Sequence, residues 1–176
     1  QAQSTQNWRL VFMSTGELGL DAKLKEVGMR SKAGQEVRMI EIPAETGRFG
    51  VWEDLHGRAD GATFADELKA AVRANFGTPI QHFLREVVPV IREWIPGIHR
   101  IQSDFVREIV PPGADGQVHR VASKFGLAAA AGELGRHVGV FPWDEGEAIR
   151  AAIACFRSWL ALRGTAGSLE AHEGVQ

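Results

Sequence analysis

The sequence predicts an α/β fold that is mostly helical: the last strands of a sheet, followed by a helical subdomain. Two short apolar runs, WRLVFM (8–13) and VRMIEI (37–42), have the length and composition of buried strands, and Pro43 ends the second. The residues between the two runs place apolar side chains at helical spacing, namely Leu20, Leu24 and Val27. A strand, a helix and a second strand in this order favour parallel pairing through a right-handed crossover. From Thr63 onward only helical patterns occur.

The composition is that of an ordinary folded protein with one domain or two small ones. The chain has 176 residues, of which 44% are hydrophobic and 24% charged, and its formal charge of −2 is no global signature of nucleic-acid binding. Because Cys155 is the only cysteine, it indicates a reducing compartment, and we expect a cytoplasmic protein. No apolar stretch is long enough to span a bilayer. The start QAQSTQN lacks an initiator methionine and predicts a fragment or a trimmed product.

Ser14 and the residues after it are interpreted as the start of a helix. Ser14, with Glu17 three positions later, has the pattern of a capping box, in which each side chain bonds an exposed backbone N–H of the first turn. A looser segment that contains the sequence DLHG separates this part from the later helices. We therefore divide the chain into residues 1–61, a helical subdomain at 62–164 and a flexible tail at 165–176.

Capping residues and prolines divide the helical part into segments. Thr63 with Asp66 is expected to cap one helix, and Thr78, followed by Pro79, is expected to start the next. Prolines are expected to end helices or turn the chain at three places: Pro89, Pro96-Gly97 and Pro111-Pro112. The helix before the last of these has an amphipathic face made of Ile98, Ile101, Phe105 and Ile109.

The last two helices have the clearest periodicity. The first has an apolar face made of Val118, Val121, Ala122, Phe125 and Ala129. Gly139 is expected to close this helix, and Glu133 is expected to be a solvated charge. Asp144 with Glu147 is expected to cap the final helix, and Gly164 suits its end. The apolar stripe of the final helix consists of Ala148, Ala152, Cys155, Phe156 and Trp159.

The sequence lacks the motifs of a self-contained enzyme. It has no G-x-x-x-x-G-K-[ST] phosphate loop, no acidic pair at the end of an apolar strand, and no H-E-x-x-H, C-x-x-C or G-x-S-x-G pattern. None of its six histidines has a partner at metal-ligand spacing. An unrelated small enzyme with a pocket among Trp52, His56 and Trp143 stays open as an interpretation.

Five segments in a fixed order resemble one known family. They span Trp8 to Gly164 and read WRLVFMSTGELGLDAKL, AGQEVRMIEIPAE, DLHG, GQVHRVASKFGLAAAAGELG and WDEGEAIRAAIACFRSWLALRG. They look like the C-terminal part of the domain-of-unknown-function family nine-two-seven. These are helicase-like proteins of plasmids, phages and integrative elements, similar to MCM-like AAA+ ATPases, and they include inactivated derivatives. The resemblance implies that the two strands belong to an AAA+ P-loop-type sheet and that residues 62–164 form its helical lid.

The same resemblance implies roles for four polar residues. Ser14 and Thr15, directly after the first strand, would occupy the sensor-one position beside the γ-phosphate. Arg38 (with Arg30 as the reserve) would be the arginine finger that acts on the ATP of a neighbouring subunit, and Arg120 would be the sensor-two arginine of the lid. Simpler roles stay open for each residue. These are helix capping for the serine and threonine, a surface position for the finger candidate, and the polar face of a helix for the lid arginine.

These roles imply the C-terminal fragment of an ATP-dependent DNA helicase of a mobile genetic element, acting in DNA replication or transfer. The nucleotide-binding and magnesium-binding segments would lie upstream of Gln1. The full-length parent would therefore use ATP and Mg²⁺, bind DNA and assemble into a ring. We expect no cofactor for the chain alone, and no ATP hydrolysis by it. The alternative is a stand-alone, non-enzymatic helical interaction module, either decayed or excised from such a motor.

Overall fold

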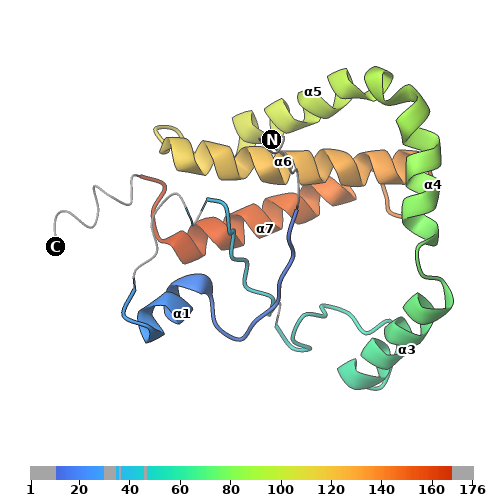
Figure 1. The fold of residues 1–176 in the computed structure, drawn as a ribbon, viewed down its shortest axis with the longest axis horizontal. Coiled ribbons are helices and arrows are strands. Elements are labelled where there is room, and N and C mark those ends of the chain that lie inside the picture. The colour runs from blue at the N-terminus through green and yellow to red at the C-terminus, as the bar shows by residue number, and fades with distance from the viewer. Residues whose placement is uncertain (1–10, 30–34, 36, 46, 168–176) are drawn as a thin grey trace, which may run out of the picture. The chain divides into compact units, whose positions relative to one another are not determined.

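The computed structural model describes residues 11–29, 35, 37–45 and 47–167. The chain divides into two compact units, Gln1–Lys32 and Ala33–Gln176. In the first unit the described helix is α1 (Leu20–Glu26). The second unit contains α3 (Gly61–Ala74), α4 (Thr78–Val87), the short 3₁₀ helix η1 (Val88–Val90), α5 (Ile91–Ile109), α6 (Gly116–His137) and α7 (Glu147–Arg163) (Figure 1).

The predicted α/β fold is wrong, because the described residues contain no strand and no sheet. Residues 11–13 of the first run have no regular structure, and their side chains are 85 to 97% exposed. The remaining residues of that run, 8–10, lie outside the described part. In the second run the N–H groups of Arg38 and Met39 both donate to the carbonyl of Gln35 at 2.9 Å, so the chain turns there. A strand needs a partner strand for its backbone N–H and C=O groups, and no described segment provides one here.

The second apolar run contributes to a helical core. Val37 is buried, and Ile40 packs against the same cluster of side chains. The other buried members of this core come from three helices: Phe105 of α5; Val118, Val121, Ala122, Phe125 and Ala129 of α6; and Ala152, Phe156 and Trp159 of α7. The AAA+ P-loop-type sheet that the resemblance implied is therefore absent from the described residues. The apolar run is buried against helices instead of in a sheet.

The first helix of the second unit begins earlier than predicted. Asp60 is the N-cap of α3, and its carboxylate accepts the backbone N–H of Thr63 at 2.7 Å. The predicted cap, Thr63, is thus the donor and not the capping acceptor. Hydrogen bonds from the backbone and the side chain of Thr63 hold the pKa of Asp60 below its ordinary value. The next helix, α4, starts at Thr78 with Pro79 in its first turn, as predicted, and ends at Val87 before Pro89.

The predicted turn at Pro96-Gly97 is wrong, because α5 continues through both residues. A proline at this position removes one backbone hydrogen bond of the helix, at a cost of about 3 kcal/mol. The apolar face that begins at Ile98 packs on α6 and buries Phe105, and this burial offsets the loss. The helix ends at Ile109, directly before Val110 and the Pro111-Pro112 pair, as predicted.

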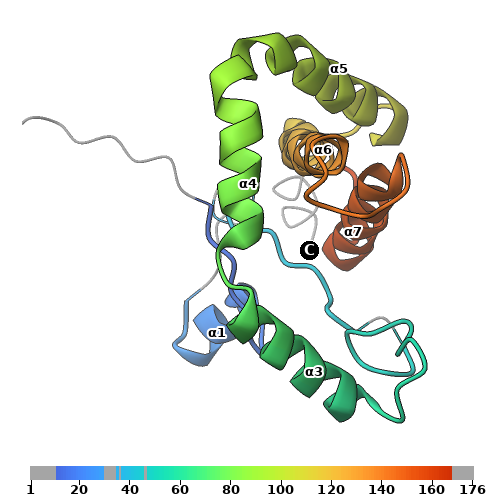
Figure 2. The same cartoon turned by 90° about the vertical axis from the view of Figure 1, so that its right-hand side faces the viewer.

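The two C-terminal helices match the sequence prediction closely. All five residues of the predicted α6 face are buried, and α7 buries its predicted stripe except for the half-buried Cys155. Gly139 follows α6 with φ of +76°, and Val140 N–H donates to the carbonyl of Gly135, which closes the helix in a Schellman motif. Gly164 ends α7 with φ of +78°. Figure 2 shows α6 lying against both α5 and α7.

Candidate functional site

The predicted sensor-one residues lie in the first unit. Ser14 and Thr15 are exposed in the irregular segment that precedes α1. The capping box predicted for Ser14 is not formed, because α1 starts at Leu20 and its N-cap is Gly19. Arg38 and Arg120 belong to the second unit, so the structure defines no distance between the two pairs. The reserve finger residue, Arg30, lies outside the described residues.

Of the two predicted arginines of the second unit, Arg120 lies on α6, and Arg38 follows a residue whose carbonyl contacts that helix. Lys124 reaches from α6 to the carbonyl of Val37, with 2.5 Å between Nζ and O, and Arg38 is the next residue along the chain. Arg120 lies one helical turn before Lys124, and its Nε donates to the carbonyl of Gly116 at 3.3 Å. Both arginines are exposed. The first half of α6 thus carries two cationic side chains one helical turn apart, Arg120 and Lys124.

The rings considered for a small-enzyme pocket pack on different partners. The Trp52 and Phe64 ring centroids are 4.9 Å apart, and His56 lies 5.7 Å from the same phenylalanine. Trp143 instead stacks on Phe141, with ring centroids 4.1 Å apart and ring planes within 8°. These ring contacts are those of packing side chains, and they do not join Trp143 to Trp52 and His56.

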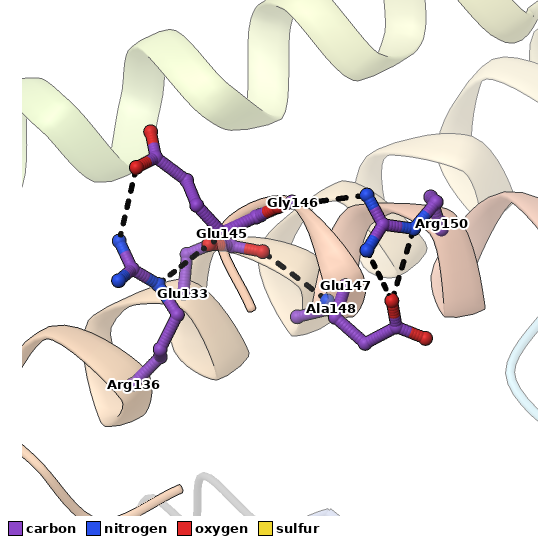
Figure 3. Close-up of polar contacts among 7 residues, drawn as sticks. All are labelled: Glu133, Arg136, Glu145, Gly146, Glu147, Ala148 and Arg150. Carbon is purple, nitrogen blue, oxygen red and sulfur yellow. Dashed lines mark hydrogen bonds and ion pairs between the residues drawn. The ribbon is translucent and has the colours of Figure 1, made fainter. Parts of the chain in front are cut away.

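Glu133 is buried, so the prediction that it is a solvated charge is wrong. Its side chain bonds the first turn of α7: Oε2 accepts the N–H of Gly146 at 3.1 Å, and Oε1 accepts the N–H of Ala148 at 3.2 Å (Figure 3). Arg136 donates to Oε2 at 3.3 Å and also lies 3.7 Å from the Glu145 carboxylate. Both carboxylate oxygens are thus occupied as acceptors, which suits a structural role and not that of a catalytic base.

The predicted cap of α7 by Asp144 with Glu147 is wrong. The N-cap is Gly146, with φ of +81°, and Glu147 pairs with Arg150 instead. The missing side-chain cap comes from Glu133, thirteen residues earlier in the chain. The sequence signal for it was an acidic residue among the small residues Gly132 and Gly135, both of which contact the segment after α6 closely.

Exposed apolar residues of the second unit follow one another along α3, α4, η1 and the start of α5. On α3 and just after it, Leu68, Val72 and Phe76 are exposed, and all three line an open hollow that continues to Pro79. On α4, η1 and α5 five exposed residues follow one another at helical spacing. We call them the apolar stripe: Ile80, Leu84, Val88, Ile91 and Ile95.

Neither a metal centre nor a membrane span is found in the described part of the chain. No three His, Cys, Asp or Glu side chains gather there in a way that could hold a metal ion. None of the described helices combines the length and the apolar character that crossing a membrane requires. Compared with known protein families, with curated proteins and with solved structures, the chain matches none.

Proposed function

We propose that this chain is a helical protein-interaction module, in which α5, α6 and α7 form the scaffold and the apolar stripe binds a partner. The observation that carries the proposal is the exposure of the stripe. Its five aliphatic side chains are between 39 and 58% exposed, whereas Val87, on another side of α4, is only 3% exposed. Helix α4 thus packs one apolar side against the rest of the fold and leaves a second apolar side exposed to solvent.

Such a stripe is what helix-mediated recognition uses. Its members recur at intervals of four, four, three and four residues, which is the spacing of one helical side on α4 and again on α5. Anchors at this spacing are read by grooves and by other helices. Burying apolar surface stabilises a complex by roughly 25 cal/mol for each Å² removed from water, which favours a complex in which the stripe is covered.

The scaffold holds the stripe in a defined direction. On α4, His82 Nε2 lies 2.8 Å from the carbonyl of Val138, just after the end of α6. At the start of α5 the rings of Trp94 and His137 meet edge to face, with centroids 4.9 Å apart. Both contacts tie the stripe-bearing segment to α6, so the stripe is presented on a fixed support.

Photo-crosslinking tests this proposal. A benzophenone amino acid at Leu84 or Val88, in the cells that naturally contain the protein, is expected to capture a discrete partner, because the label lies inside the covered surface. The same label at Arg157, an exposed position of α7, is the matched control and is expected to capture none. Failure to crosslink at all five stripe positions would show that the stripe has no partner.

The second candidate function is the lid of an ATP-dependent DNA motor. Its support is the family resemblance, together with the exposure of both Arg38 and Arg120. In a longer parent with a P-loop, Arg38 would act in trans on a neighbour's ATP, while Thr15 and Arg120 would act in cis. ATP, Mg²⁺, DNA and a ring of subunits would belong to that parent.

Mutation of the parent protein tests the motor function. Reading the gene upstream of the codon for Gln1 decides whether a P-loop is encoded there. If it is, Arg38→Ala is expected to lower the ATPase rate by at least about tenfold, because the transition-state charge loses a partner. Arg157→Ala serves as the control and is expected to keep the rate. An unchanged ATPase rate in Arg38→Ala would remove the arginine-finger role.

A further inference from the structure

The apolar stripe has a polar flank that contains no acidic residue. Side chains three or four residues apart are neighbours on the surface of a helix. Four polar residues have this spacing to a member of the stripe: Gln81 to Leu84, Arg85 to Val88, and both Arg92 and His99 to Ile95. All four are exposed. We call them the basic flank, because the two arginines are its permanently charged members.

The two glutamates of the same segment point away from the stripe. Glu86 and Glu93 each follow an arginine of the basic flank directly, but no member of the stripe lies three or four residues from either of them. The other side of the stripe is formed by Phe83, Val87 and Trp94, which are buried or half-buried. The stripe therefore has packed side chains along one side and cations, without carboxylates, along the other.

The two arginines of the basic flank are not neutralised within the described part of the chain. No ion pair or hydrogen bond joins either guanidinium group to another described residue, whereas Arg58 and Arg107 both pair with carboxylates. Helix stability does not explain Arg92, because it lies in the first turn of α5, where the helix dipole disfavours a cation. Positive charge is thus available beside the exposed aliphatic side chains.

We propose that the apolar stripe binds an acidic amphipathic helix of another protein, whose aliphatic side chains cover the stripe and whose carboxylates pair with Arg85 and Arg92. This inference rests on the proposed interaction function and names the chemistry of the partner. Charged residues beside the apolar seam of two paired helices set partner choice and orientation. Opposite charges also speed association, and like charges exclude wrong partners.

A nucleic acid fits this surface less well than an acidic helix does. Its phosphates supply negative charge, but its backbone has no aliphatic side chains to set against the stripe. The stripe has five exposed aliphatic residues and its flank has two arginines, so most of the surface is apolar. An amphipathic helix covers both kinds of residue at once, because its apolar and charged positions repeat at the spacing found here.

Fluorescence anisotropy with two helical peptides tests the proposal. Each is a fluorescein-labelled peptide of about 21 residues with leucine at the seam positions, and the positions beside the seam are glutamate in one peptide and lysine in the other. The glutamate peptide is expected to bind the wild-type chain at least about tenfold more tightly than the lysine peptide. Equal affinities, or no binding of either peptide at about 1 mM protein, would overturn the proposal.

Charge reversal shows whether the basic flank contacts the peptide. Arg85→Glu/Arg92→Glu is expected to reverse the preference, so that the lysine peptide binds more tightly than the glutamate peptide. The matched control is Arg100→Glu/Arg157→Glu, which changes the net charge by the same amount at exposed positions outside the flank. This control is expected to keep the preference for the glutamate peptide. If both double variants changed the two affinities alike, net charge would be the cause and the role of the flank would be wrong.

A labelled single-stranded DNA of about 20 nucleotides tests the other class of ligand. It is expected to bind the wild-type chain more weakly than the glutamate peptide does. DNA that bound more tightly, and that lost this binding in Arg85→Glu/Arg92→Glu, would identify a nucleic acid as the ligand of the flank and overturn the acidic helix.

Leu84→Ser separates failure of this inference from failure of the proposed function. The variant removes one exposed aliphatic side chain and is expected to weaken the glutamate peptide by about tenfold. If it weakens both peptides while the wild-type chain binds them equally, the stripe is an interaction surface whose flank selects no charge. If neither peptide binds but the benzophenone label at Leu84 captures a protein, the interaction function holds and the partner chemistry is wrong. Absence of both signals removes both proposals.

Discussion

Glu133→Ala is expected to lower the free energy of unfolding by roughly 3 kcal/mol, the largest effect that we predict for a single side chain. The variant leaves the N–H groups of Gly146 and Ala148 without their acceptor, in a region where Ala148 is buried. It also removes the negative charge from the N-terminus of α7, where the helix dipole favours an anion. Urea unfolding followed by circular dichroism measures the change.

Two companion variants separate the possible causes. Glu133→Gln keeps the size of the side chain and one acceptor oxygen, so we expect an intermediate loss of about 1 to 2 kcal/mol. Glu145→Ala removes the other carboxylate beside Arg136, but that side chain is 87% exposed, so the expected change is within about 0.5 kcal/mol. A Glu133→Ala protein that unfolds at the same urea concentration as Glu145→Ala would show that Glu133 does not act as the cap of α7.

Gly132→Ala is expected to destabilise the protein by about 2 kcal/mol, although alanine is the better helix former. A Cβ atom on residue 132 would lie 2.5 Å from the Cβ of Ala148 on α7. Real Cβ atoms do not approach so closely, so α6 and α7 would have to move apart. Their separation would weaken the packing around Trp143, which is also near this glycine. Thermal and urea unfolding report the loss.

Gly97→Ala is the matched control, because it makes the same substitution inside α5. No atom lies within 4 Å of the Cβ that it would add, so we expect a gain of about 0.5 to 1 kcal/mol from helix propensity. The double variant Gly132→Ala/Ala148→Gly removes the clash from the other side and is expected to recover part of the lost stability. If Gly132→Ala and Gly97→Ala changed stability in the same direction, close packing of α6 on α7 would not explain the effect of Gly132→Ala.

The start of α4, the ends of α5, α6 and α7, and the apolar faces of α6 and α7 follow from local signals in the sequence. The apolar faces of α6 and α7 recur at helical spacing, and the glycines after each helix supply the left-handed backbone that closes it. Pro79 and Pro89 likewise act within one helical turn of their own position. These signals depend on neighbours in the chain, so the sequence was sufficient to read them.

The candidate site could be predicted only in part. The spacing of Ile80, Leu84, Val88, Ile91 and Ile95 can be seen in the sequence. Whether such a face is part of the core or an exposed surface depends on tertiary packing, because residues at similar spacing on α6 are buried in the core. The roles of Ser14, Thr15, Arg38 and Arg120 came from a family resemblance and stay predictions.

By itself, the sequence determined where α4 begins, where α5, α6 and α7 end, and which faces of α6 and α7 are apolar, because periodicity and helix-ending residues act over a few residues. Only the tertiary structure decided the rest. Val37 is buried among helices instead of in a sheet, and α5 runs through Pro96 because its packing outweighs one lost hydrogen bond. Glu133 caps a helix that starts fourteen residues later. Each outcome depends on residues far away in the chain, whose contacts no local pattern contains.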